Sequence, residues 1–145
     1  MAGQKILILD DDPEIATLFA LTLRQLGNEV NVFTRFEDAR HQLTEACPDA
    51  LLTDIRVGEY NGIQLAHLFR HRSPNGPLVI VTAYHDVVLE KEVRGLEGDY
   101  LVKPVSLGRL RRAFDPMTVA SRDIAKLPPV INDEASTFRA RARAR

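Results

Sequence analysis

The sequence predicts an α/β fold in which a parallel sheet of five strands is covered by helices. Two observations support this prediction. Short apolar runs alternate with segments whose apolar residues recur at helical spacing, which gives five strand–helix units by residue 114. Four of the apolar runs also end in polar side chains, and sheets of this kind bind ligands at the carboxyl ends of their strands. A chain of 145 residues suits one domain with a core of its own.

The first unit pairs a strand at residues 5–9 with a helix at residues 13–26. Asp12 precedes the helix and is a favoured N-cap residue, while Gly27 follows its end. Asp12 is therefore assigned to capping in preference to a metal role. The stripe of this helix that faces the sheet is expected to comprise Ile15, Leu18, Phe19, Thr22 and Leu26.

The second and third units follow the same pattern. Residues 29–33 alternate like a partly exposed strand and residues 36–46 like an amphipathic helix. Residues 49–53 form an uninterrupted apolar run, which is typical of a strand buried on both faces. A loop at residues 55–61 is expected to lead into a helix at residues 63–71.

The last two units begin after a turn rich in proline and glycine at residues 73–77. A strand is predicted at residues 78–81, a short helix near residues 86–94 and the fifth strand at about residues 99–102. Ser106 begins the last helix.

Carboxylates are concentrated where two of these strands end. Three consecutive aspartates occupy residues 10–12, and Asp54 closes the third strand. Thr82 and Lys103 end the fourth and fifth strands, so the four groups should share one edge of the sheet. Two ionised groups about 4 Å apart repel by roughly 4 kcal/mol at an effective dielectric near 20. Such a cluster needs a cation or a raised pKa, and hard oxygen ligands favour magnesium (Mg2+).

Composition excludes several classes of protein. The net charge is −1, so no general attraction to nucleic acid is expected. The single cysteine, Cys47, excludes an internal disulfide. No apolar run is long enough to span a membrane, and the first residues do not resemble a signal peptide. The chain is therefore expected to be a soluble cytoplasmic protein that binds neither membranes nor nucleic acid directly.

Four motifs occur in order along the chain. They are Ile-Leu-Ile-Leu-Asp-Asp-Asp at residues 6–12, Thr-Asp-Ile-Arg at 53–56 with Gly62 eight positions after the aspartate, Val-Thr-Ala at 81–83, and Tyr-Leu-Val-Lys-Pro at 100–104. Together they resemble the receiver domain of bacterial two-component response regulators, over roughly residues 4–114. The resemblance implies a flavodoxin-like, doubly wound sheet with strand order 2-1-3-4-5.

The resemblance also implies a phosphorylation site. Asp54 would accept a phosphoryl group from a sensor histidine kinase or a phosphotransfer protein, and Lys103 and Thr82 would contact the phosphoryl oxygens. Magnesium would be held by Asp10, Asp11, Asp54 and the backbone carbonyl of Arg56, with Asp10 acting mostly through water. The Lys103–Pro104 peptide bond would be cis. The chain would be no enzyme toward other substrates and would catalyse only its own phosphoryl transfer and dephosphorylation.

Thr82 and Tyr100 would report phosphorylation, because Tyr100 would swing inward as Thr82 moves. The altered surface would comprise the fourth helix, the fifth strand and the fifth helix, and it would bind a downstream protein or a second copy of the chain. A basic face on this surface would be formed by Arg109, Arg111 and Arg112. The plainer alternative is an ordinary solvated helix face.

Two other functions are compatible with parts of the sequence. A haloacid-dehalogenase-type phosphatase would use Asp10 and Asp12, but Asp54 would then have no role. Such a phosphatase also needs an acidic residue after the fourth strand, and residues 81–85 of this sequence contain none. A flavodoxin-type cofactor binder needs a phosphate loop after the first strand, where the acidic residues 10–12 would repel phosphate.

The sequence departs from the receiver pattern in the loop after Asp54 and again at residues 95–98. Val57-Gly58 stands where methionine-proline is usual, so the loop beside the metal is expected to be loosened. Arg56 and Tyr84 lie where side chains could shield the acyl phosphate from water, which leaves the lifetime of the phosphoryl group open.

Residues 115–145 form a C-terminal extension of different character. They carry a net charge of +2, against −3 for residues 1–114. The arginines at 139, 141, 143 and 145 would share one face of an extended chain. A mobile charged end is expected. The alternative is that this row of arginines docks on an acidic surface of a partner or of the chain itself. Because this extension is too short for a typical DNA-binding output module, the output is expected in a partner protein, a dimer surface or a module outside this sequence.

Overall fold

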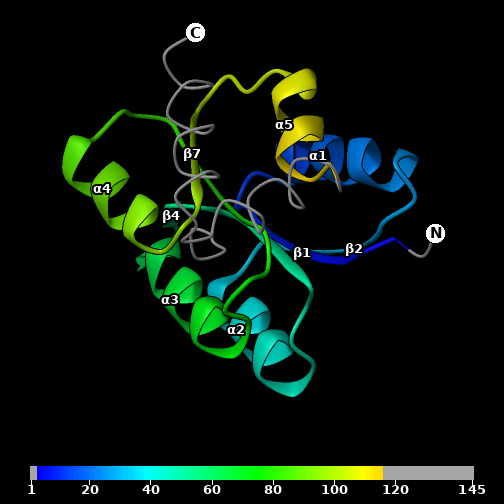
Figure 1. The fold of residues 1–145 in the computed structure, drawn as a ribbon, viewed down its shortest axis with the longest axis horizontal. Coiled ribbons are helices and arrows are strands. Elements are labelled where there is room, and N and C mark those ends of the chain that lie inside the picture. Colours follow the sequence, from blue (N-terminus) through cyan, green and yellow to red (C-terminus); the bar gives the residue numbers. More distant parts are fainter. Residues whose placement is uncertain (1–2, 116–145) are drawn as a thin grey trace, which may run out of the picture.

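A parallel five-stranded sheet with helices on both faces forms the body of the protein (Figure 1). The computed structural model describes residues 3–115. The strands of the main sheet are β1 (Lys5–Leu9), β2 (Glu29–Phe33), β3 (Ala50–Asp54), β6 (Leu78–Thr82) and β7 (Asp99–Val102). The helices are α1 (Pro13–Gln25), α2 (Phe36–Glu45), α3 (Gly62–Arg72), α4 (Val87–Gly95) and α5 (Leu107–Ala113).

The strand order is β2-β1-β3-β6-β7, and every neighbouring pair is parallel. This confirms the predicted fold and the predicted order of the five main strands. The bounds of these elements agree with the predicted bounds to within one residue. Within residues 3–115, no helix has both the length and the apolar character needed to cross a membrane. The extension predicted for residues 115–145 lies, beyond Asp115, outside the described residues.

Side-chain caps fix the starts of α1 and α4. The carboxylate of Asp12 accepts hydrogen bonds from the backbone N–H groups of Glu14 and Ile15, at 3.0 and 3.4 Å, which confirms Asp12 as the N-cap of α1. Asp86 caps α4 through the backbone N–H groups at 88 and 89. Each such cap contributes about 1 kcal/mol to stability.

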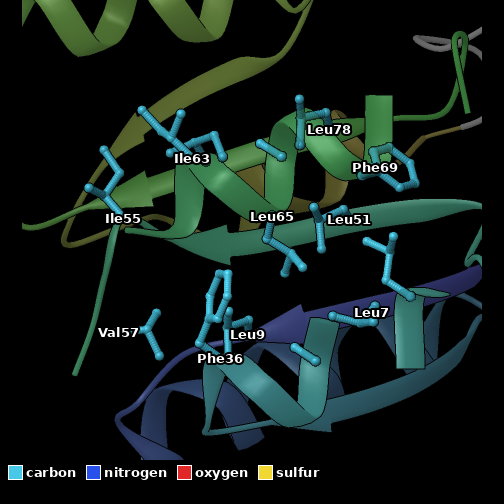
Figure 2. Packing of buried hydrophobic residues seen from close by; sticks show 14 of the residues in the cluster. Leu7, Leu9, Phe36, Leu51, Ile55, Val57, Ile63, Leu65, Phe69 and Leu78 are labelled. Atoms are coloured by element: carbon cyan, nitrogen blue, oxygen red, sulfur yellow. The ribbon is translucent and has the colours of Figure 1, made fainter. Parts of the chain in front are cut away.

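Alternate residues of the strands face opposite sides of the sheet, and this alternation divides the core into two clusters. On one side the strands contribute Leu7, Leu9, Leu51, Leu78 and Ile80, which pack against α2 and α3. In Figure 2, Phe36 from α2 and Leu65 and Phe69 from α3 point into this cluster. On the other side α1 and α5 cover Ile6, Ile8, Leu52, Val79 and Val81 (Figure 1). The central strand β3 is buried along its whole length.

The buried face of α1 differs from the predicted stripe. Phe19 and Thr22 are buried as expected, but Leu18 and Leu26 are exposed. Their places are taken by Ala16, Ala20 and Leu23. The two alanines are four residues apart on one row of the helix, so α1 can approach the sheet closely along that row. The prediction chose mainly large apolar residues for the buried face of α1. It was wrong at Leu18 and Leu26 because small alanines face the sheet instead.

Residues 55–61 were predicted to be a loop, and this was wrong for four of the seven residues. They contain an antiparallel hairpin of two short strands, β4 (Arg56–Val57) and β5 (Tyr60–Asn61). Gly58 lies in the turn with a φ of +60°, a conformation that glycine adopts without strain. The expected loosening by this glycine is opposed by two contacts, because Val57 is buried and the ring of Tyr60 stacks on that of Phe36.

Arg70 joins the end of α3 to two loops. Its guanidinium donates hydrogen bonds to the backbone carbonyls of Leu96, Ser73 and Gly76, at 2.7, 2.9 and 2.8 Å. Burial lowers the pKa of Arg70 from its ordinary value, and Glu97 partly offsets that effect. The side chain thus fixes the connections that precede β6 and β7.

Replacing this donor should weaken the fold. We expect Arg70→Met to lower the free energy of unfolding by about 1–3 kcal/mol, because three carbonyls lose a charged donor. Urea denaturation measures the change. Arg72→Met is the matched control, since Arg72 donates to one carbonyl, that of Thr44, at an exposed site. Equal losses in the two variants would contradict the role assigned to Arg70.

Candidate functional site

Four strand ends bring polar side chains to one edge of the sheet. Asp10 follows β1 directly, Asp54 is the last residue of β3, Thr82 is the last residue of β6, and Lys103 follows β7. Asp54 is in register with Val81, next to Thr82, and Thr82 is in register with Val102, next to Lys103. The structure therefore brings together the residues that the sequence placed at this edge.

The carboxylates of Asp10, Asp11 and Asp54 form a compact group. One oxygen from each lies within 4.8 Å of the others, a spacing that suits shared coordination of a cation. Asp10 and Asp54 are 2% and 8% exposed, whereas Asp11 faces solvent. Carboxylate oxygens in this arrangement fit a hard divalent cation such as magnesium, and the exposed Asp11 leaves one side of the group open to water.

Asp12 is turned away from this group. Its carboxylate caps α1, and its backbone N–H donates to the Oδ1 atom of Asp10 at 2.9 Å. The third aspartate of the run thus orients Asp10 through its backbone and adds no carboxylate to the cluster.

Lys103 lies between the two buried carboxylates. Its Nζ atom is 3.2 Å from Oδ2 of Asp10 and 3.1 Å from Oδ2 of Asp54. Its backbone N–H donates to the carbonyl of Thr82 at 2.7 Å, and the Lys103–Pro104 peptide bond is cis, as predicted. The ammonium therefore bridges the two buried carboxylates of the group.

Burial and charge set the protonation of this group. Burial raises the pKa of Asp10 above its ordinary value of 3.8, and the Asp12 N–H and Lys103 offset this only in part. Burial alone would lower the pKa of Lys103, but its contacts with Asp54 and Asp10 outweigh that effect, and the net shift is upward. The lysine is thus held as a cation, while Asp10 bears a penalty for its charge.

Thr82 and Tyr100 are joined through the backbone of Tyr84. The Thr82 hydroxyl and the Tyr100 hydroxyl donate to the same acceptor, the Tyr84 carbonyl, at 3.0 and 3.2 Å. The Tyr100 hydroxyl also accepts from the backbone N–H of Asp86 at 3.1 Å, at the start of α4. Tyr100 is buried in this position. Sequence reasoning missed the shared acceptor, because a backbone carbonyl leaves no mark on residue identity.

The segment that follows Asp54 folds back, so that Gly62 at its end packs against the backbone of Asp54. Arg56, whose backbone carbonyl was predicted as a metal ligand, is the first residue of β4, and its side chain is exposed. The N–H of Gly62 donates to the carbonyl of Ile55, and a Cβ atom at Gly62 would overlap the backbone carbonyl of Asp54. Glycine is therefore required eight residues after Asp54 by close packing.

The ion pairs of Lys103 should stabilise the protein in the absence of divalent cations. We expect Lys103→Met to lower the free energy of unfolding at about pH 7 by about 1–3 kcal/mol, because Asp10 and Asp54 lose their counter-charge. The contribution of Lys103 is present below its unfolded pKa of 10.5, so neutral pH reveals it fully.

The same variant should recover stability as the pH falls. In Lys103→Met the pKa of Asp10 in the folded state would rise further, because the nearby cation is gone. Asp10 would then become protonated as the pH falls, and the unpaired buried charge would disappear. Urea denaturation at about pH 7 and about pH 5, without divalent cations, should therefore show a smaller difference from wild type at the lower pH. A difference of the same size at both pH values would contradict the pairing with Asp10.

Comparison with known sequences places most of the chain in one family. The sequence model described as the response regulator receiver domain matches residues 6–115. The chain is 35% identical over 114 residues to the response regulator protein PilR of Pseudomonas aeruginosa, covering 77% of this chain and 25% of PilR. It is 32% identical over 127 residues to the transcriptional regulatory protein ZraR of Salmonella typhimurium, covering 85% of this chain and 28% of ZraR. The chain thus spans under a third of the length of these curated relatives.

Solved structures agree with the fold. A CheY-like response regulator receiver domain from Methanospirillum hungatei superposes with a TM-score of 0.75 at 20% identity, covering 86% of this chain and 99% of that chain. A response regulator structure from Chloroflexus aurantiacus gives a TM-score of 0.67 at 28% identity, covering 77% and 98% of the two chains. The edge of the sheet described above lies within the matched residues 6–115.

Proposed function

This chain belongs to the response regulator receiver domain family, and from that premise we propose that Asp54 is the phosphoryl acceptor of a signalling switch. The observation that carries the proposal is the position of Asp54, whose Oδ2 atom lies 3.1 Å from Nζ of Lys103 beside Asp10 and Asp11. The comparisons give no support to the haloacid-dehalogenase alternative, and the Asp12 carboxylate that it would use caps α1.

The chemistry follows from the charges around Asp54. A carboxylate oxygen of Asp54 forms the new bond to phosphorus as the bond to the donor breaks, and the donor leaves with that electron pair. Lys103, already beside this carboxylate, can contact the oxygens of the transferred group. The Thr82 hydroxyl, at the end of the neighbouring strand, can do the same if it leaves the Tyr84 carbonyl.

The residues at this edge fit magnesium. Asp10, Asp11, Asp54 and the backbone carbonyl of Arg56 would hold the ion, which when bound neutralises charge on the phosphoryl oxygens and on the attacking carboxylate. Asp10 is held by the Asp12 N–H and Lys103, so its orientation is set before an ion arrives. The proposed reaction is confined to the chain's own phosphorylation and dephosphorylation.

Partners are proposed from the family. A sensor histidine kinase or a phosphotransfer protein would supply the phosphoryl group, and the response would pass to a downstream protein or a second copy of the chain through α4, β7 and α5. A pocket of about 410 Å3 on this surface is lined by Arg94, Arg109 and Arg112 together with Asp99. Arg109 and Arg112 belong to the predicted basic face, and Arg94 extends it onto α4.

Phosphorylation at Asp54 can be tested directly. With acetyl phosphate and magnesium, we expect the protein to gain one acid-labile phosphoryl group by mass. Asp54→Asn should gain none, because the nucleophilic carboxylate is gone, whereas Asp38→Asn, at an exposed position of α2, should be labelled like wild type. Labelling of the Asp54→Asn variant at the wild-type level would refute the assignment.

The switch can be followed by amide chemical shifts. We expect phosphorylation to shift resonances from residues 82–86 onward into α4, because Thr82 and Tyr100 share the Tyr84 carbonyl and Tyr100 also binds the Asp86 N–H. In Tyr100→Phe, which lacks the hydroxyl, the shifts in α4 should shrink while those beside Asp54 persist. Shifts confined to the surroundings of Asp54 in the wild-type protein would contradict this route.

A further inference from the structure

The hairpin formed by β4 and β5 is closed at its base. It begins two residues after Asp54 and ends where α3 starts. At the base, Ile55 is buried, and its carbonyl accepts a hydrogen bond from the N–H of Gly62. Gly62 packs directly on the backbone of Asp54. The hairpin is therefore a short closed extension of the strand that ends in Asp54.

Two side chains hold the hairpin beyond its base. Val57 is buried in the same apolar cluster as Phe36, and both are labelled in Figure 2. The ring of Tyr60 lies flat on that of Phe36, with centroids 4.7 Å apart and planes within 8°. Phe36 is buried at the start of α2, so it offers a fixed surface. Tyr60 is half-exposed, and its outer face is open to solvent.

The hairpin also reaches the carboxylate cluster. The backbone N–H of Gly58, in the turn, donates to Oδ2 of Asp11 at 3.4 Å. This distance is long for a hydrogen bond, so the contact is weak and easily given up. Asp11, Phe36, Gly58 and Tyr60 line one pocket of about 240 Å3. The stacked rings and the exposed carboxylate of the cluster are thus walls of the same pocket.

We propose that Tyr60 is a positioning residue for the metal site: by stacking on Phe36 it holds the hairpin that carries the Arg56 carbonyl and the Gly58 N–H against the carboxylate cluster. The inference rests on the magnesium site proposed above. Strands of two residues have little stability of their own, so their position depends on tertiary contacts. Without the stack, ion binding must first order the hairpin, and that ordering lowers the affinity.

The proposal makes Tyr60 act through the hairpin, with no contact between its side chain and the ion. Removing the ring should therefore raise the magnesium concentration needed for half-saturation while leaving the chemistry at saturation intact. We expect about a two- to tenfold loss of affinity in Tyr60→Ala, the range that corresponds to one aromatic pair. Tyr60→Phe keeps the ring and should bind magnesium like wild type.

Magnesium alone is the probe, titrated against the full chain while amide chemical shifts are recorded. In Tyr60→Ala the Gly58 amide resonance should also move in the ion-free protein, because the turn is released from Asp11. Leu68→Ala is the matched control, since Leu68 on α3 is 41% exposed against 45% for Tyr60 and lies outside the pocket. Thermal unfolding of each variant verifies that it is folded at the temperature of the titration.

Labelling with acetyl phosphate separates this inference from the proposed function. At saturating magnesium, Tyr60→Ala should be labelled at the wild-type rate, and at limiting magnesium it should be slower. Wild-type magnesium affinity in Tyr60→Ala, or an equal loss in Tyr60→Phe, would overturn the positioning role while leaving Asp54 as acceptor. A wild-type protein that binds magnesium but gains no phosphoryl group would instead refute Asp54 as acceptor while leaving the positioning role of Tyr60 intact.

Discussion

The repulsion between buried carboxylates at the edge of the sheet is the constraint around which the site is arranged. Asp10 and Asp54 end neighbouring strands, and both are buried, so their charges are poorly screened. Lys103 partly balances these charges from the end of β7, although β6 lies between β7 and β3. The flexible four-carbon stem of Lys103 lets its ammonium reach two carboxylates across β6. A cation bound at this cluster would meet charges that this ammonium already balances in part.

The strand that Lys103 crosses carries the second set of contacts. The Thr82 carbonyl, at the end of β6, accepts the backbone N–H of Lys103, while its hydroxyl donates to the Tyr84 carbonyl. Tyr100 is bound to that carbonyl and to the start of α4. If Thr82 turned toward a group on Asp54, Tyr84 would lose one of its two donors. The segment after β6 is thus tied both to Thr82 and, through Tyr100, to the start of α4.

Sequence patterns predicted what depends on local periodicity. The five main strands, their helices and the meeting of Asp10, Asp54, Thr82 and Lys103 follow from apolar spacing and from the direction of parallel strands. The buried face of α1 did not follow, because Ala16 and Ala20 allow a close approach that large apolar residues do not reveal. The Tyr84 carbonyl could not be found from side-chain identity at all. The wrong face of α1 and the missed Tyr84 carbonyl have the same cause. Both depend on how one element packs against another.

The hairpin after Asp54 illustrates the same limit in its strongest form. Gly58 alone predicts a mobile turn, because glycine has the widest choice of backbone conformations. The stacking partner of Tyr60 is Phe36, which lies 24 residues earlier and belongs to a different element. The local sequence therefore indicates a flexible hairpin, whereas stacking on the distant Phe36 ring restricts its motion. A receiver loop can therefore depart from its usual residues and still keep a defined position beside the carboxylate cluster, because a tertiary contact replaces the stiffness that local residues no longer supply.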